Sequence, residues 1–302
     1  MREITFKISL GAAVFAAIAF VYCSGLWASV LKPIEVSQGE VFELKVSGVG
    51  LTTVEGMLGK RRIIFYPDYH DQYGALVGID LESKPRLTNV IIKGTTSAGA
   101  QKRVQIPLNI KAKSFPQESF VVAAEFDDLG PEVLDRIRRE QAQLEEVFSV
   151  SAPKRLWELP FILPVPGEMT SAFGYRRIIN GIPRAPHTGV DLRALLGSDV
   201  LAANHGRIAL MGEFFYSGKT IVLDHGCGLY TMYFHLSEFN VEKGAEVRKG
   251  EIIGLSGMTG RVTGPHLHWG ARLNGARVDP FDLIQKFTGK VQPAAGADLN
   301  IR

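Results

Sequence analysis

The chain has 302 residues, of which 46% are hydrophobic and 22% charged, the proportions of an ordinary folded protein of one or two domains. Its formal net charge is +3. The lysines and arginines form no long basic run of the kind found in nucleic-acid-binding proteins, so we expect no nucleic-acid partner.

An uncharged stretch lies between Lys7 and Lys32 and is rich in Ala, Val, Ile and Phe. It is long enough to span a bilayer, and a basic residue, Arg2, precedes it. We interpret residues 1–31 as a signal peptide or a membrane anchor; both alternatives stay open. Either one predicts an exported protein of the periplasm or cell envelope, with anchoring to the inner membrane as one option. If Cys23 is removed with a signal, Cys227 is left alone and no internal disulfide can form.

Residues 32–115 are predicted to form a β-sandwich, because residues 104–110 alternate apolar and polar side chains with the period of a half-buried strand. Strand-like runs also occupy residues 41–46, 62–66, 75–81 and 89–93, each between turn signals. Their number and spacing favour an immunoglobulin-like fold. Such a module would act as a spacer, or it would position substrate, bind a partner or control access to a site.

Residues 116–158 are predicted to be a linker that contains one amphipathic helix. Proline suits the first turn of a helix, and Pro131 is followed by Leu134, Ile137, Leu144 and Phe148 at helical spacing. The helix should end near residue 150. We expect it to pack between two domains, with docking of a partner protein as the alternative.

Six of the seven histidines lie between His187 and His268. A catalytic zinc ion takes three protein ligands from His, Asp, Glu or Cys and leaves a position for water. His187 and Asp191 are four residues apart, so they can share an ion only if the chain bends at Gly189. Two further histidines, at 266 and 268, would point to one face of a strand, and spacing alone does not choose between them.

Several sequence blocks in this region resemble, in order and spacing, the lysostaphin-type (LytM) zinc metallo-endopeptidases, which cut peptide cross-links of bacterial peptidoglycan. The blocks are Phe173-Gly-Tyr-Arg176, His187-Thr-Gly-Val-Asp191, Tyr233-Phe-His-Leu-Ser237 and Gly264-Pro-His-Leu-His268. The resemblance covers roughly residues 160 to 285. It implies an antiparallel β domain at residues 159–288 with zinc on the floor of a groove. The end of the chain is rich in Ala, Pro and Gly, so we expect a flexible tail at residues 289–302.

The resemblance also implies residue roles. His187, Asp191 and His268 match the zinc ligands, and His235 and His266 match the two catalytic histidines. Zinc lowers the pKa of a bound water to about 7. His266 would take or pass the proton of this water and later protonate the leaving amine, while His235 would bind the developing oxyanion or orient the water.

Other residues have plainer interpretations. We interpret His205 and His225 as packed or surface residues in turns, and Cys227 as a small packed residue. The aromatic run Phe214, Phe215 and Tyr216 is either a groove wall or a hairpin tip. Four arginines near the first zinc motif are either a solvated rim or a site of attraction for stem-peptide carboxylates; they are Arg176, Arg177, Arg184 and Arg193.

The resulting hypothesis is an exported zinc-dependent endopeptidase that hydrolyses peptidoglycan cross-links, with the bond between D-alanine and diaminopimelate as the expected target. The alternative is a non-catalytic envelope protein that binds peptidoglycan or activates a cell-wall amidase. The sequence identifies neither the substrate-binding residues nor a regulatory partner.

Overall fold

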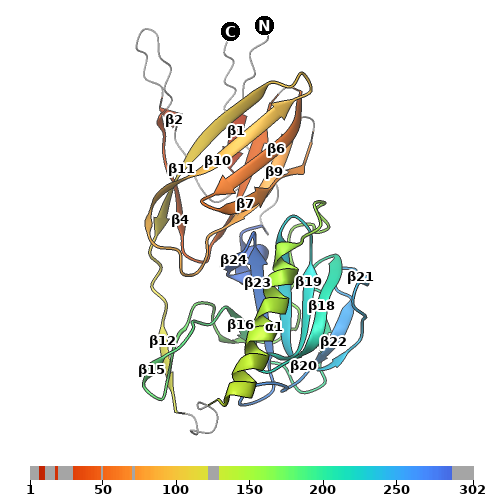
Figure 1. Ribbon diagram of the computed structural model, residues 1–302. Coiled ribbons are helices and arrows are strands. Elements are labelled where there is room, and N and C mark those ends of the chain that lie inside the picture. The colour runs from red at the N-terminus through yellow and green to blue at the C-terminus, as the bar shows by residue number, and fades with distance from the viewer. Residues whose placement is uncertain are drawn as a thin grey trace.

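The computed structural model describes residues 7–10, 18–19, 30–48, 50–69, 72–121 and 129–287. This part of the chain is mainly β, as predicted, and is arranged as two bodies that lie end to end in Figure 1. We call residues 7–10 together with residues 34–111 the N-terminal β module, and residues 129–287 the C-terminal domain.

Two sheets build the N-terminal β module. The first has the order β1 (Lys7–Leu10), β5 (Val41–Ser47), β9 (Gln72–Gly78) and β8 (Tyr66–Pro67). The second has the order β4 (Ile34–Ser37), β11 (Gln101–Lys111), β10 (Arg86–Thr96), β6 (Leu51–Leu58) and β7 (Arg61–Ile64). A separate pair joins β2 (Ile18–Ala19) to β3 (Val30–Leu31). The predicted strands are present, whereas β1 to β4 and β6 were not predicted.

The core of this module lies between the two sheets. On β11 the alternate residues Ile106, Leu108 and Ile110 are buried, and they join side chains from β5 and β9 of the other sheet in one cluster. The alternation follows from the pleat, which turns every second side chain inward. The sandwich is therefore held by burial of one face of each sheet.

The C-terminal domain is built on one large antiparallel sheet. Its main path has the order β13 (Met169–Ser171), β16 (Gly189–Leu192), β23 (Leu267–Leu273), β20 (Leu229–Phe239), β19 (Gly218–Asp224), β18 (Gly206–Phe214) and β21 (Glu246–Val247). Off this path, β17 (Asp199–Leu201) pairs with β22 (Ile252–Ser256), β22 pairs with β20, and β24 (Ala276–Val278) pairs with β23. A short helix, α2 (Pro280–Gln285), follows.

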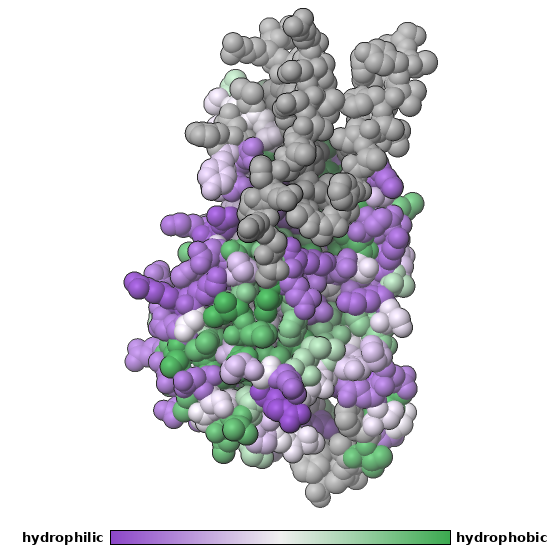
Figure 2. All heavy atoms as spheres, turned by 180° about the vertical axis from the view of Figure 1, so that it is seen from behind, coloured by the Kyte–Doolittle hydropathy of each residue, from purple (hydrophilic) through white to green (hydrophobic). Residues whose placement is uncertain are grey.

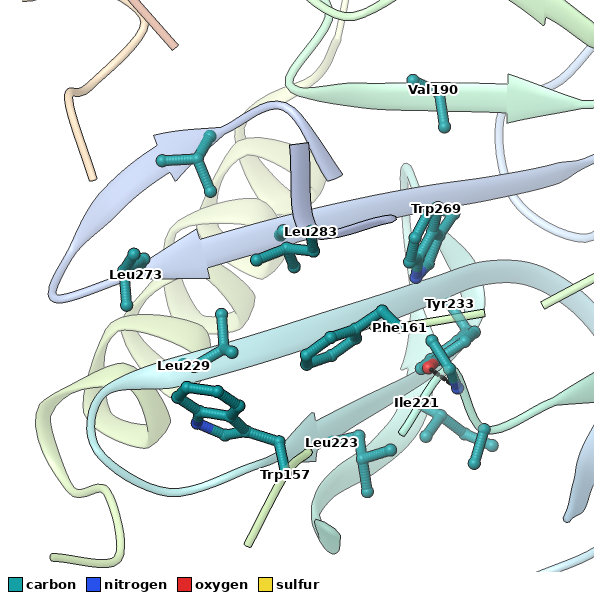
Figure 3. Close-up of a cluster of buried hydrophobic side chains, with 14 of the residues drawn as sticks. Trp157, Phe161, Val190, Ile221, Leu223, Leu229, Tyr233, Trp269, Leu273 and Leu283 are labelled. Atoms are coloured by element: carbon teal, nitrogen blue, oxygen red, sulfur yellow. Dashed lines mark hydrogen bonds between the residues drawn. The ribbon is translucent and has the colours of Figure 1, made fainter. Parts of the chain in front are cut away.

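A cluster of large buried side chains fills one side of this sheet (Figure 3). Trp269 and Tyr233 are fully buried there, beside Phe161 and Trp157 from the segment that leads into the domain. The Tyr233 hydroxyl accepts a hydrogen bond of 2.9 Å from the Ala203 backbone N–H. The segment before the sheet is thus part of the core.

Helix α1 (Pro131–Ser149) begins and ends where the sequence predicted. The prediction that it packs between two domains is wrong. It packs against the sheet of the C-terminal domain, where Leu144, Val147 and Phe148 meet a cluster that includes Tyr230 and Met232 (Figure 1). The Tyr230 hydroxyl donates to the Val147 carbonyl at 3.0 Å. The aromatic and apolar side chains of β20 on this face thus partly bury the C-terminal half of the apolar stripe of the helix.

The two bodies contact each other directly instead. The buried cluster of the C-terminal domain includes Leu76 and Leu81 of the N-terminal β module. The Arg277 guanidinium donates two hydrogen bonds, of 2.8 and 3.0 Å, to the two carboxylate oxygens of Asp80. Burial raises the pKa of Asp80, but the hydrogen bonds from Arg277 outweigh burial and hold that pKa below its ordinary value.

A close approach at Gly39 adds to this contact. Gly39 of the N-terminal β module has a φ of +81° and leaves room for Phe173 of the C-terminal domain, since a Cβ on Gly39 would lie 2.5 Å from the ring of Phe173.

A third, small sheet joins the connection between the bodies to the C-terminal domain. Strand β12 (Gln117–Phe120) runs parallel to β14 (Arg176–Ile179), which forms a hairpin with β15 (Ile182–Pro183) (Figure 1). The chain therefore passes the end of the sheet that carries β13 and β16 before it enters α1.

Most of the predicted signal or anchor, and the predicted tail at residues 289–302, lie outside the described residues. Among the described helices none combines the length and apolar character that a membrane crossing needs. Figure 2 shows an apolar area in the middle of the rear face, bordered by polar side chains. The visible surface is therefore mixed rather than uniformly polar.

Candidate metal centre and active site

His187, Asp191 and His268 converge at one point of the sheet. Asp191 on β16 is the antiparallel register partner of His268 on β23, so both side chains emerge from the same face. The distances among His187 Nε2, Asp191 Oδ1 and His268 Nδ1 are 3.0, 2.9 and 2.9 Å. Gly189, where we expected a bend, is the first residue of β16, and a Cβ there would lie 2.6 Å from His268 Nε2.

The surroundings of the two histidines fix their orientation. His187 Nδ1 lies 2.9 Å from the Ala172 carbonyl, which can only accept, so Nδ1 carries the ring proton and Nε2 offers a lone pair. The ring of His268 stacks on Phe234, with 5.0 Å between centroids and 5° between planes. Both rings are thereby held with a nitrogen toward Asp191.

The charge states suit a cation. Burial raises the pKa of Asp191, but its contacts with the rings of His187 and His268 outweigh burial, and the pKa lies well below its ordinary value. Burial lowers the pKa of His268 to about 4. At neutral pH the cluster therefore holds an ionised carboxylate and neutral imidazole.

These three donor atoms fit zinc. Ligands at about 2.0 Å from a tetrahedral zinc ion lie about 3.3 Å from one another, and the observed edges of 2.9 to 3.0 Å are within a few tenths of an ångström of that value. Two imidazole nitrogens and one carboxylate oxygen are also a usual donor set for catalytic zinc.

His235 and His266 lie beside this cluster, with 4.9 Å between their ring centroids. His266 Nε2 is 3.8 Å from Asp191 Oδ1, and its Nδ1 lies 2.9 Å from the Gly264 carbonyl. His235 Nδ1 lies 2.9 Å from the Thr259 carbonyl. Each Nδ1 therefore carries the proton, and each Nε2 is a proton acceptor. Burial lowers the pKa of His235 to about 3, so this ring is neutral.

Of the four arginines near the first motif, Arg177 reaches the site. Its guanidinium lies 3.5 Å from Asp191 Oδ2, while the Nε atom is buried without a hydrogen-bond partner among the described residues. Arg176 instead lies over the ring of Phe115, 5.8 Å from its centroid. Arg177 thus lies next to the carboxylate oxygen that does not face the two histidines.

The residues with plainer interpretations behave as predicted. His225 is fully buried, donates through Nδ1 to the His205 carbonyl at 2.7 Å and contacts Thr231 through Nε2; burial lowers its pKa to about 4. Cys227 is buried, and burial raises the pKa of its thiol to about 11, so it is no nucleophile at neutral pH.

The aromatic run at the β18–β19 hairpin is divided. Phe214 is buried in the cluster that packs against α1, so it is not a groove wall. Tyr216 is exposed at the tip, where the guanidinium of Arg261 lies 5.7 Å from its ring centroid. Its carbonyl accepts from the Arg261 backbone N–H, next to the loop that carries Thr259.

Nothing in the sequence indicates the residues behind His187. The Ser171 hydroxyl lies 3.3 Å from His187 Nδ1 and donates to Glu118 Oε1 at 3.2 Å. A lone serine before Phe173 and a glutamate some fifty positions upstream carry no recognisable spacing, because the sheet pairing that joins them is non-local.

Comparison with known proteins agrees with this geometry. The model of Peptidase family M23 matches residues 185–280. The DD-carboxypeptidase/endopeptidase Mpg of Neisseria meningitidis serogroup B is 43% identical over 115 residues, which is 38% of this chain and 26% of that protein. The peptidoglycan DD-endopeptidase ShyA of Vibrio cholerae is 40% identical over 112 residues, 37% of this chain and 26% of that protein. The chain thus spans about a quarter of the length of these relatives.

Similarity to a solved structure extends further along the chain. A peptidase M23 from Pseudomonas aeruginosa superposes with a TM-score of 0.64 at 28% identity, over 83% of this chain and 96% of the other. That coverage includes both bodies of the fold. Together with the matched motifs and the His–Asp–His cluster, these similarities show that the chain carries a domain of Peptidase family M23, of the lysostaphin (LytM) type.

Proposed function

We propose that this protein is a zinc-dependent endopeptidase that hydrolyses peptide cross-links of peptidoglycan. The observation that carries the proposal is the triangle of His187 Nε2, Asp191 Oδ1 and His268 Nδ1, with two further histidines beside it. When bound, zinc supplies a Lewis acid that acidifies water and polarises a carbonyl group.

His266 is the proposed general base and acid. Its Nε2 is unprotonated, faces the ligand cluster, and belongs to a side chain that is 21% exposed, so water and substrate can reach it. It accepts a proton from the attacking water while the new C–O bond forms. It then delivers that proton to the amine nitrogen as the peptide C–N bond breaks.

His235 is proposed to orient the attacking water. Its proton is held by the Thr259 carbonyl, so Nε2 accepts a hydrogen bond rather than donating one to an oxyanion. The low pKa of this buried ring supports the same role. Two roles were considered for His235 from the sequence, orientation of the water and binding of the oxyanion. This arrangement favours orientation of the water.

The names of the relatives support peptidoglycan as the proposed substrate. One matched protein is named a DD-carboxypeptidase/endopeptidase, and another is named a peptidoglycan DD-endopeptidase. We therefore propose the bond between D-alanine and diaminopimelate as the target, and the periplasm or cell envelope as the location. Export through residues 1–31, by a cleaved signal or an inner-membrane anchor, is part of this proposal.

We also propose an immunoglobulin-like class for the sandwich of residues 32–115 and a peptidase domain at residues 159–288, joined by the linker 116–158. The two facing sheets support the first, and the sheet around the His–Asp–His cluster supports the second.

The proposal is tested by incubating the purified protein with peptidoglycan, with and without a zinc chelator, and analysing released fragments by mass spectrometry. We expect chelator-sensitive release of uncross-linked stem peptides, and none from a His187→Ala variant. If zinc-loaded protein releases no fragments while His187→Ala retains the biological effect, the protein is the non-catalytic binder or amidase activator instead.

A further inference from the structure

Three segments that are distant in sequence meet behind the zinc ligand His187. They are β12 through Glu118, β13 through Ser171, and the turn before β16 through His187 itself. We propose that Glu118 is a positioning residue that acts through Ser171 on His187, so that the connection between the two bodies of the fold strengthens zinc binding. The inference rests on the zinc site of the proposed function.

Sheet register places the three groups. Ser171 is the antiparallel partner of Asp191 in the β13–β16 pair, and Glu118 is the parallel partner of Arg177 in the β12–β14 pair. Ser171 on β13, at the edge of the main sheet, is thus aligned with Asp191, and Glu118 on the small third sheet is aligned with Arg177. Because both pairings are backbone-determined, the contact does not depend on a flexible loop.

The protons in this chain of contacts have one consistent arrangement. His187 Nδ1 carries its proton because the Ala172 carbonyl can only accept. Ser171 cannot then donate to Nδ1, so its oxygen is a second acceptor for that N–H, and its own proton goes to Glu118 Oε1. The carboxylate therefore polarises the hydroxyl, the hydroxyl favours the Nδ1–H form, and Nε2 is left as the ligand atom.

The expected size follows from known outer contacts of metal sites. A carboxylate bonded directly to a zinc-ligating histidine typically changes metal affinity or activity by about 10- to 100-fold. Here a hydroxyl intervenes, and Glu118 and Ser171 are only half-buried, so we expect about tenfold, the lower end of that range.

The experiment is a double-mutant cycle on the full chain with Glu118→Gln, Ser171→Ala and the double variant. Zinc affinity is measured by competition with a chromophoric chelator, and thermal unfolding of the metal-free forms checks that each variant folds. We expect Glu118→Gln to weaken zinc binding about tenfold, and to add little in the Ser171→Ala background, because the contact to His187 is then already absent.

Ser119→Ala is the matched control, since Ser119 is the exposed neighbour on the same strand and should leave zinc affinity unchanged. Unchanged affinity in Glu118→Gln, or an equal loss with and without Ser171, overturns the inference. If the unmodified protein binds no zinc, the proposed function itself fails, and this outcome is distinct from a wild-type site that Glu118→Gln does not alter.

Discussion

Backbone carbonyls decide what the site histidines can do. Ala172, Gly264 and Thr259 each accept the Nδ1 proton of one ring, so His187, His266 and His235 all present an unprotonated Nε2. A free histidine would share its proton between both nitrogens. The tautomers are therefore built into the fold before any metal or substrate arrives.

Substitution of the two neighbouring histidines separates their roles. His266→Ala should keep about one zinc per protein and lower turnover by about 10²- to 10⁴-fold, the usual contribution of a general base. His268→Ala should lose both zinc and turnover, because its Nδ1 belongs to the ligand triangle. Metal content by mass spectrometry and fragment release measure the two effects; loss of zinc from His266→Ala would show that the ligand assignment is wrong.

The buried His225 predicts a pH dependence of stability. Its folded pKa of about 4 lies below the ordinary 6.5, so the unfolded state binds more protons between these values. Stability should therefore fall as pH drops from 6.5 to 4, by about 3 kcal/mol from this group if the whole shift is realised. His225→Asn, which retains a donor for the His205 carbonyl, should show a smaller fall in urea midpoints. Equal falls in both proteins would contradict the assignment.

For single residues, motif resemblance predicts five candidate site residues, and the structure brings all five together. Nothing in the motifs indicates the proton positions, because the accepting carbonyls of Ala172 and Thr259 belong to residues of no distinctive type. Glu118 and Ser171 are likewise invisible in the sequence, since only pairing between distant strands brings them to His187.

Helix α1 could be predicted from the sequence, but the surface against which it packs could not. The spacing of Leu134, Ile137, Leu144 and Phe148 gives the helix and its apolar stripe, and any apolar surface would satisfy that stripe. The sheet face around Tyr230 and Met232 does so here, on the side where Phe234 stacks against His268. The helix therefore supports the same face of the sheet as the metal site.

Removal of one side chain tests this packing. Phe148→Ala should lower the free energy of unfolding by about 2 kcal/mol, less than for a fully buried ring, because Phe148 is half-buried against Tyr230 with 5.3 Å between centroids. Leu134→Ala, at a position 43% exposed, is the control and should cost less than about 1 kcal/mol. Urea unfolding of both variants provides the comparison; equal costs would show that the helix is not anchored through Phe148.

For the whole molecule the sequence predicts two β bodies and a helix in the correct order, but not how they are joined. The buried contact of Leu81 and Leu76 with the C-terminal domain has no signature, because such residues equally suit an isolated core. Only the fold shows that the apolar edge of one body continues into the other.

Since the two bodies share buried side chains and the Arg277–Asp80 pair, we expect one cooperative unfolding transition. Leu81→Ala, at a fully buried position, should destabilise the whole protein by about 2 to 5 kcal/mol. Calorimetry of both proteins tests this expectation. Two resolved transitions in the unmodified protein, or a shift of only one of them in the variant, would show that the bodies unfold independently.

The route of the chain through β12 limits how this protein can be recombined. A chimera that joins a foreign front module after residue 121 would discard β12, and with it Glu118 and the parallel partner of β14. A chimera joined before residue 112 would retain β12. It would, however, expose the side chains of Leu273 and Val278, which face the N-terminal β module. A working exchange therefore has to transplant both the crossing strand and a matching apolar surface, so the smallest portable unit is larger than the 185–280 segment.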